Sequence, residues 1–256
     1  MIFTKKKLFI IFSLILFPIV TFTLIFNLYT KVTPSTESTD VKNTDKVTSV
    51  VEKVISKYTA ATSIKEENKI IKNAKGLSKE VLHLALKAYH NAYNDDEIKN
   101  NKLTIIDYSL PSNAKRMWVI DMDKKLVDIN TYVSHGVRSG EKNSTSFSNK
   151  KESHQSSIGV MKTGAIYHGK RGMSLHLHGL EDNVNSNVYQ RHVVIHGASY
   201  VSDNIAKNRG QIGRSFGCPA VDNKIAKPLI KKIANGSLVF AYYPLKSWLN
   251  SSEYLI

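Results

Sequence analysis

Short strand-like runs dominate the chain between residues 102 and 243. Each run is rich in β-branched, aromatic or other apolar residues and is bounded by polar turn residues, which is typical of strands. The expected strands are 102–108, 116–121, 126–133, 158–163, 174–177, 193–195 and 237–243. Runs 116–121 and 126–133 flank a tight polar turn and should form a β-hairpin. The pattern predicts a mostly-β sandwich or barrel.

Two stretches in the same part of the chain have helical rather than strand periodicity. Ser78 is a suitable N-cap for the first, and apolar residues then recur at i+3 and i+4 up to Asn94. This apolar stripe comprises Val81, Leu82, Ala85, Ala88, Tyr89, Ala92 and Tyr93. The second helix is expected over residues 223–234, with Gly236 as its stop. A few helices therefore accompany the β-rich domain.

The N-terminus has the features of an export signal. Lys5, Lys6 and Lys7 precede an uncharged apolar run from Leu8 to Phe26, which is about long enough to cross a bilayer. We expect residues 1–28 to be a signal peptide or an uncleaved membrane anchor, with the lysines inside and the rest exported. Residues 29–75 read as a tether with a weak helix, and 76–248 as the folded domain.

The charge of the chain restricts its partners. The formal net charge of +15 implies a polyanionic neighbour such as nucleic acid, an anionic membrane surface or a cell-wall polymer. No zinc-finger spacing, basic zipper or aromatic RNA-binding signature accompanies the scattered lysines. The sequence therefore argues against nucleic acid and favours the cell envelope.

Cys218 is the only cysteine of the 256 residues. A lone cysteine is often a small, inert, buried residue, and that alternative stays open. However, Cys218 lies in the turn-like sequence Gly217-Cys218-Pro219 rather than in an apolar run. An exported chain with one cysteine cannot form an internal disulfide, and an idle thiol in an oxidising compartment is a liability. A reactive thiol is the sharper hypothesis.

His196 is the natural base for this thiol. It follows the apolar run 193–195, so a strand could hold its ring rigidly over the loop that carries Cys218. The carbonyl of Gly197 could accept a hydrogen bond from one ring nitrogen and leave the other free to take a proton. The backbone N–H groups of Gly217 and Cys218 could form an oxyanion hole. These residues together predict acyl transfer through a thioester.

Two other classes of function compete with this hypothesis. The pair His176 and His178, and the pair His192 and His196, could suggest a zinc site, but no His-Glu-x-x-His sequence is present. We therefore expect no metal. A non-catalytic wall-binding module would suit the charge and the tether, but it leaves His196 and the Cys218 loop unexplained.

The residues also match a known family. His196-Gly197 followed by Ser215-x-Gly217-Cys218 resembles the signature of L,D-transpeptidases, and residues from about 77 to 243 resemble the murein L,D-transpeptidase catalytic domain family. The matching stretches are Leu103-Thr104-Ile105-Ile106-Asp107-Tyr108-Ser109 with Pro111-Ser112-Asn113, Ser146-Phe147-Ser148-Asn149, His154-Gln155-Ser156-Ser157-Ile158-Gly159 and Gly213-Arg214-Ser215-Phe216-Gly217-Cys218-Pro219-Ala220.

The resemblance implies a β-sandwich-like domain that acts on peptidoglycan stem peptides without a cofactor. Cys218 would be the nucleophile, His196 the base and Gly197 the residue that orients it. The cysteine would attack after the L-centre of the third stem residue, release D-alanine and pass the acyl group to an amine. We expect the remaining substrate contacts from Arg214, Ser215 and His176.

The chain departs from the best-known members of this family near the cysteine. Phe216 stands where they have a second histidine, and Pro219-Ala220 stand where they have an apolar residue followed by Arg or Asn. The separation between His196 and Cys218 is also longer. These departures leave open an L,D-carboxypeptidase, in which water resolves the thioester.

Overall fold

The computed structural model describes residues 63–256 of the chain. The expected signal or anchor segment and most of the expected tether lie outside these residues. Within 63–256, no helix combines the length and the apolar character that a membrane crossing needs. Residues 63–71 are helical, and Ile70 and Ala74 are buried in the core. The packed domain therefore begins before residue 76, where the sequence placed its start.

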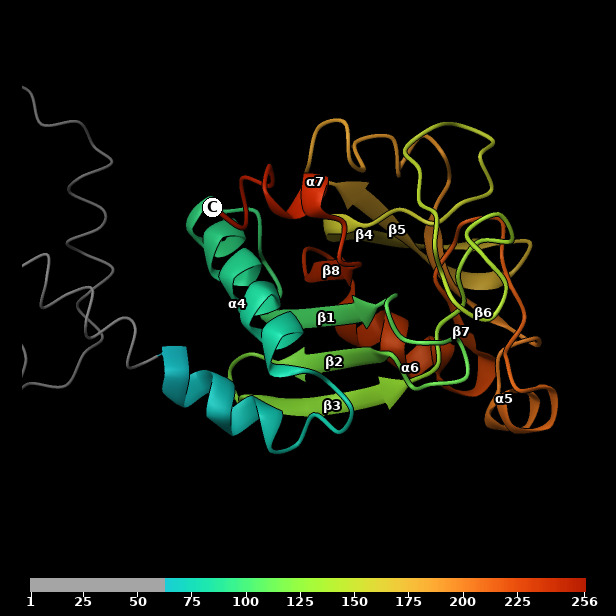
Figure 1. Ribbon diagram of the computed structural model, residues 1–256, viewed down its shortest axis with the longest axis horizontal. Coiled ribbons are helices and arrows are strands. Elements are labelled where there is room, and N and C mark those ends of the chain that lie inside the picture. The colour runs from blue at the N-terminus through green and yellow to red at the C-terminus, as the bar shows by residue number, and fades with distance from the viewer. Residues whose placement is uncertain (1–62) are drawn as a thin grey trace, which may run out of the picture. The chain divides into compact units, whose positions relative to one another are not determined.

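The described residues form one mixed eight-stranded sheet with the order β3-β2-β1-β8-β4-β5-β6-β7. Most neighbours are antiparallel, but β1 with β8 and β6 with β7 are parallel. In Figure 1, β1, β2 and β3 lie in the lower part of the view and β4 and β5 in the upper part, with β8 between them. The strands are Lys102–Asp107 (β1), Met117–Asp121 (β2), Leu126–Thr131 (β3), Gly159–Gly169 (β4), Gly172–Gly179 (β5), Val194–Ala198 (β6), Ala220–Asp222 (β7) and Leu238–Tyr242 (β8).

The expectation of a mostly-β domain is confirmed, whereas a sandwich of two sheets is not what the strands form. Helix α6 (Asn223–Ile233) contacts β1 as well as β4, β5, β6 and β7. One helix can reach strands from both halves of the order only if the sheet curls around it. Its buried face, which comprises Ala226, Leu229, Ile230 and Ile233, fills the inside of the curl. Strand periodicity alone does not distinguish a curled sheet from two packed sheets.

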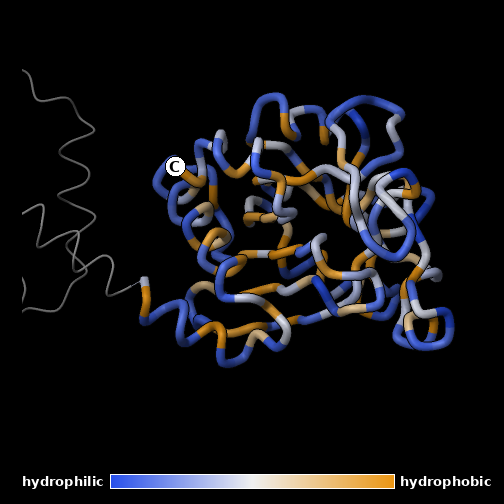
Figure 2. The backbone as a smooth tube through the Cα atoms, in the orientation of Figure 1, coloured by the Kyte–Doolittle hydropathy of each residue, from blue (hydrophilic) through white to orange (hydrophobic). Residues whose placement is uncertain are grey.

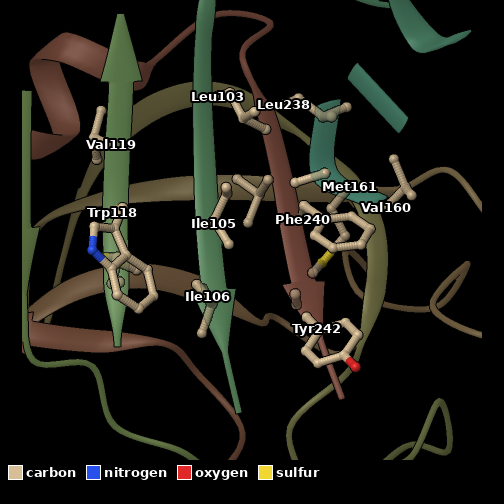
Figure 3. Close-up of a cluster of buried hydrophobic side chains, with 14 of the residues drawn as sticks. Leu103, Ile105, Ile106, Trp118, Val119, Val160, Met161, Leu238, Phe240 and Tyr242 are labelled. Atoms are coloured by element: carbon tan, nitrogen blue, oxygen red, sulfur yellow. The ribbon is translucent and has the colours of Figure 1, made fainter. Parts of the chain in front are cut away.

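The core lies along the middle strands. Every residue of β2 and of β8 is buried, as are the residues of β1 after Lys102. Side chains from these strands and from β4 pack together in Figure 3, among them Trp118, Ile105, Phe240 and Val160. Figure 2 shows the same strands as hydrophobic stretches between hydrophilic loops. Strands covered on both faces read as continuous apolar runs, as these do.

Helix α4 (Lys79–Asn94) covers β1 and β8. Ser78 caps it as expected, because its side chain accepts a hydrogen bond from the N–H of Val81. The buried face matches the predicted stripe with one exchange: Leu86 is buried, and Tyr93 is 53% exposed. The prediction that Tyr93 is buried was wrong. Tyr93 lies at the edge of the apolar stripe, where burial depends on which neighbour packs against it.

Most element predictions are confirmed, and the misses are short. The β2–β3 hairpin forms as expected, while β4 and β5 extend further than the sequence indicated. Strand β6 does not end at His196 but continues through Gly197 to Ala198. Three short elements were not predicted: β7, α5 (Asp203–Arg209) and α7 (Lys246–Leu249). Elements this short carry too few residues for a periodic signal.

Candidate functional site

The strands bring His196 and Cys218 to the same place. His196 of β6 pairs with Ser174 of β5 on one side and with Ala220 of β7 on the other. Because Cys218 precedes β7 by two residues, the parallel pairing sets it beside the beginning of β6. The N–H of Val194 lies 3.5 Å from its Sγ and donates to it. The chain between His196 and Cys218, which are 22 positions apart, thus folds back, as the sequence suggested.

His196 and Cys218 line one cavity of about 220 Å³. The other lining residues come from β4, β5 and β6, from residue 192 and from the β4–β5 turn. They are Tyr167, Gly169, Lys170, Arg171, Ser174, His192 and Val194. A candidate nucleophile and a candidate base therefore face a shared space large enough for a small group of a substrate.

The ring of His196 is held in one orientation. Its Nδ1 lies 2.8 Å from the carbonyl oxygen of Gly197, which can only accept, so Nδ1 carries the proton and donates. Nε2 is then left with its lone pair. Gly197 lies close to helix α6, since a Cβ there would lie 2.5 Å from Oδ1 of Asn223 and 3.0 Å from Cβ of Ala226. Burial lowers the pKa of His196, the Gly197 carbonyl opposes this, and the positive charge of Arg171 lowers it further.

The thiol of Cys218 is uncharged in these surroundings. Burial raises its pKa above the ordinary value, against the opposing effects of the Val194 N–H and of the positive charges on Arg171 and Arg191. The thiol also donates to the carbonyl of His192, with 3.6 Å between sulfur and oxygen. A neutral thiol and a neutral imidazole therefore stand in the resting site, rather than a preformed thiolate–imidazolium pair.

Serine side chains hold the Cys218 loop. The carbonyl of Cys218 accepts hydrogen bonds from the hydroxyls of Ser215 (2.6 Å) and Ser134 (3.3 Å). The hydroxyl of Ser156 donates to the carbonyl of Gly217 at 3.3 Å. Ser134, Ser156 and Ser215 are all buried. These bonds fix the backbone that carries the thiol, and only Ser215 among the three was singled out from the sequence as a site residue.

The expected oxyanion hole is corrected in one part. The N–H of Gly217 donates to Oγ of Ser215 at 3.1 Å and is thus already engaged. Gly217 has a φ of +118° and a Cβ there would meet the carbonyl oxygen of Gln155 at 2.8 Å, so its role is to let the loop turn. Among residues 63–256, the N–H of Cys218 has no hydrogen-bond partner and stays a candidate donor.

The three residues expected to bind substrate lie outside the cavity lining. Nη1 of Arg214 bonds to the carbonyl of Gly140 at 3.0 Å and to the carboxylate of Glu141 at 2.6 Å, which anchors a neighbouring loop. Ser215 is buried beneath the cysteine. His176 shares the face of β5 with Ser174 and stacks on Tyr167, which does line the cavity, with 4.3 Å between ring centroids. The sequence could not separate residues that support the loop from residues that face the cavity.

A buried arginine that the sequence analysis did not single out supports the cysteine loop through His135. Arg116 is fully buried and its guanidinium donates to the carbonyls of Val133 and Leu110, and to Nδ1 of His135 at 2.8 Å. Burial lowers the pKa of Arg116 to about 10, and burial with the adjacent guanidinium lowers that of His135 to about 4. The carbonyl of His135 accepts from the N–H of Ser215 at 2.9 Å. The available signal was an arginine directly before the apolar run 117–120.

A second guanidinium holds the segment 153–157, which lies against the cysteine loop. Arg191 donates to the carbonyl of Gln155 at 2.7 Å and to the hydroxyls of Ser157 (2.6 Å) and Ser153 (3.0 Å). Phe216, the residue in place of the second histidine, is 66% exposed and stacks on His154 with 4.6 Å between centroids. Arg191 therefore braces the segment 153–157, which contacts the cysteine loop through the hydrogen bond from Ser156 to the carbonyl of Gly217. The loop before the cysteine presents the ring of Phe216 to solvent.

The histidines considered for a metal do not converge. Across residues 63–256 there is no group of three or more His, Cys, Asp or Glu side chains arranged to hold an ion. His178 and His176 instead make aromatic contacts with Tyr189, at 4.7 and 5.2 Å between centroids.

A thiol and an oriented imidazole in one cavity of a β-rich domain define the class: a protein with a candidate cysteine nucleophile. Residues 73–242 match the family model of the L,D-transpeptidase catalytic domain. This match covers more than half of the chain, and the chain belongs to that family. The resemblance read from the sequence is thereby confirmed. A comparison with curated proteins gave no match.

Solved structures of the same family resemble the chain over part of its length. An L,D-transpeptidase from Mycobacterium smegmatis is 12% identical with a TM-score of 0.34, covering 56% of this chain and 59% of that one. L,D-transpeptidase 3 from Mycobacterium tuberculosis, in complex with a faropenem-derived adduct, is 10% identical with a TM-score of 0.32, covering 56% and 60%. An L,D-transpeptidase from Xylanimonas cellulosilytica is 14% identical with a TM-score of 0.31, covering 62% and 77%. The family assignment rests on the match to the family model.

Proposed function

We propose that the protein is a cysteine peptidyltransferase that crosslinks peptidoglycan stem peptides, with Cys218 as nucleophile and His196 as general base. The observation that carries the proposal is the shared cavity: Cys218 and His196 both line it, and the Nδ1 hydrogen bond to Gly197 leaves Nε2 of His196 free. Membership of the L,D-transpeptidase family supports the same reaction and substrate class.

The first half of the reaction forms a thioester. Nε2 of His196 takes the proton of the Cys218 thiol while the sulfur attacks the carbonyl carbon after the L-centre of the third stem residue. The N–H of Cys218 would stabilise the negative charge on the carbonyl oxygen. As the C–N bond breaks, His196 returns the proton to the leaving nitrogen, and a D-amino acid departs.

The second half of the reaction resolves the thioester. An amine of a neighbouring stem attacks the carbonyl carbon, gives its proton to Nε2 of His196, and the C–S bond breaks with the proton returning to sulfur. If water attacks instead, the same residues perform L,D-carboxypeptidase chemistry. The crosslink and the hydrolysis product therefore differ only in the acceptor.

The resting charge state makes the base necessary. Because burial raises the pKa of Cys218 and lowers that of His196, both groups are neutral at neutral pH. A neutral thiol is a poor nucleophile, so the proton must move to His196 as the C–S bond forms. Replacement of His196 should then cost much of the rate even though Cys218 is intact.

An export signal at the N-terminus would complete the proposal. Peptidoglycan lies outside the cytoplasmic membrane, so the enzyme must be exported to meet it. The basic residues Lys5, Lys6 and Lys7 and the apolar run 8–26 would direct this export and could anchor the domain at the membrane. The net charge of +15 favours an anionic envelope.

Intact-protein mass spectrometry tests the function. The full chain in detergent is incubated with purified disaccharide-tetrapeptide, and both an adduct on Cys218 and the products are sought. We expect a thioester adduct, free D-alanine and crosslinked dimer. The Cys218→Ala variant should show none of these while keeping its circular dichroism spectrum.

The outcomes separate the alternatives. An adduct with tripeptide and D-alanine but no dimer would replace the transpeptidase by the carboxypeptidase. Product formation by Cys218→Ala would refute the cysteine mechanism. A folded wild-type sample that neither forms an adduct nor turns over, but binds the wall polymer, would favour the binding module.

A further inference from the structure

The turn between β4 and β5 brings two cations to the cavity. Gly169 pairs with Gly172 at the end of the hairpin, so Lys170 and Arg171 form a two-residue turn. Gly172 has a φ of +76°, which lets the hairpin close tightly. Lys170 and Arg171 both line the cavity that also contains Cys218 and His196. Lys170 and Arg171 therefore lie at the same cavity as the candidate nucleophile, although the β4–β5 hairpin that carries them is distant from Cys218 in the sequence.

No acidic group balances these two charges. The lining of the cavity includes no aspartate or glutamate. Within residues 63–256, neither Lys170 nor Arg171 forms a hydrogen bond or an ion pair, whereas other cations of the domain do, such as Lys102 with Asp121 and Lys232 with Asp128. Unpaired cations gathered beside a cavity provide a binding site for an anion.

The charge of Arg171 reaches the groups around the thiol. It lowers the pKa of Cys218, where burial has the larger and opposite effect, and it adds to burial in lowering that of His196. It also acts against burial at Tyr200, whose hydroxyl is buried without a hydrogen-bond partner among residues 63–256. These directions agree with the geometry, in which Arg171, Cys218 and His196 line the same cavity.

The size of the cavity limits what the anion can be. Pockets for whole small-molecule ligands are roughly 300–1,000 Å³, and this cavity is about 220 Å³. It suits one amino-acid residue rather than a complete stem peptide. In the proposed reaction, the residue next to the attacked carbonyl is the leaving D-amino acid, and its free carboxylate is adjacent to the breaking C–N bond.

We propose that Lys170 and Arg171 bind the terminal carboxylate of the leaving D-amino acid, and so select donor stems that end in a free acid. This inference rests on the proposed function. A guanidinium can bind a carboxylate through two parallel hydrogen bonds, and the ammonium adds a second positive charge. Donors whose terminal carboxylate is amidated, or already consumed in a crosslink, would lose these contacts.

The first test is independent of peptidoglycan chemistry. Cys218 of the full chain is alkylated with iodoacetate, which is anionic, and with iodoacetamide, which is neutral and of similar size. The ratio of the two rates reports the local positive charge, because any change in thiol reactivity affects both reagents. We expect the ratio to fall at least about fivefold in Lys170→Gln/Arg171→Gln, since charge-assisted hydrogen bonds contribute about 1.5–3 kcal/mol. In the control Lys87→Gln, an exposed lysine of α4, it should not change.

The second test identifies the carboxylate. Wild type is compared on a tetrapeptide donor that ends in D-alanine and on the same donor ending in D-alanine amide. We expect wild type to prefer the acid by at least about tenfold in kcat/KM, with most of the difference in KM. The double variant should lose the preference, with little change on the amide.

The two arms distinguish the subsite from the function. An unchanged alkylation ratio in the double variant overturns the anion site. A changed ratio with an unchanged acid preference overturns the assignment of the site to the leaving carboxylate. If wild type turns over neither donor, the proposed function fails and with it the donor assignment, and the alkylation ratio still decides whether the turn binds carboxylates.

Discussion

The two ends of the sheet are stabilised by different forces. At the apolar end, which comprises the neighbouring strands β2, β1 and β8, every residue but Lys102 is buried and most are apolar, and α4 covers β1 and β8. At the polar end, a cysteine loop lies between the short strands β6 and β7 and is held by buried serines. Arg116 and Arg191 support it indirectly, through His135 and through the segment 153–157. Apolar burial is non-directional and sets the architecture, while hydrogen bonds fix individual atoms in place. In this domain, apolar burial in one region supplies most of the stability, and hydrogen bonds in the other hold the atoms of the site in position.

The largest loss of stability should come from the apolar end. Phe240 is fully buried in β8 and lies beside Trp248, with 5.7 Å between ring centroids. Phe240→Ala should lower the free energy of unfolding by about 3–5 kcal/mol, because it leaves a cavity that the neighbours cannot fill. Urea unfolding followed by fluorescence measures this.

The matched control is Leu245→Ala, since Leu245 is 43% exposed. Its effect should stay within about 0.5 kcal/mol. In the folded fraction of Phe240→Ala, the alkylation rate of Cys218 should equal that of wild type. A large change in that rate would show that the two ends are not separable.

At the polar end, we expect a substitution to lower the stability less than Phe240→Ala does, and to lower the activity more. Arg116→Met removes the donors to the carbonyls of Leu110 and Val133 and to His135. Buried acceptors left without partners cost about 1–3 kcal/mol each, so we expect a loss of about 3 kcal/mol in the free energy of unfolding. Because His135 holds Ser215, turnover should fall at least about tenfold.

Urea unfolding and steady-state kinetics on the same samples separate the two effects of Arg116→Met. Lys87→Met, at an exposed position of α4, serves as control and should change neither quantity. If Arg116→Met destabilised the domain but left turnover intact, the arginine would be a core residue without influence on the cysteine loop.

The smallest expected effect is a displaced pH profile. Burial and Arg171 hold the pKa of His196 below its ordinary value, and only neutral His196 can accept a proton. The acid limb of the activity profile should therefore lie below pH 6.5, the ordinary pKa of histidine, because activity falls only as the pH drops below the depressed pKa. The pH dependence of kcat/KM measures this limb.

Arg171→Gln sharpens the same prediction. Removal of the positive charge should raise the pKa of His196 and move the acid limb to higher pH. NMR titration of the imidazole gives the pKa directly. If the acid limb of the wild-type pH profile lay at or above the ordinary histidine pKa, the prediction would be wrong. His196 would then be solvated like a surface histidine, or another group would control the acid limb.

The sequence predicted those parts of the fold whose signal is local. The α4 stripe, its Ser78 cap, the β2–β3 hairpin and helix α6 follow from periodicity and turn residues, and the structure confirms them. One curled sheet instead of two sheets depends on how distant segments pair, which periodicity does not encode. The pairing of β1 with β8 joins residues more than a hundred positions apart.

The same division applies to the site. The residue types and their order in the chain indicated Cys218, His196 and Gly197, because a thiol, an imidazole and a close carbonyl suggest nucleophilic chemistry. The supporting residues Arg116, Ser134 and Ser156 were not indicated, nor were the cations Lys170 and Arg171. Their positions around the cysteine depend on contacts between strands and loops far apart in sequence.

The sequence by itself determined the strand-rich composition, the family and the candidate nucleophile with its base, since these follow from local pattern and motif. Only the tertiary structure decided which polar groups face the cavity and which support it. Arg214 was expected to bind the substrate and instead bonds Glu141. Arg171, in the turn between β4 and β5, was not expected there and lines the cavity. The physical reason is that the function of a charged side chain depends on its neighbours in space, and these are set when the sheet curls around α6.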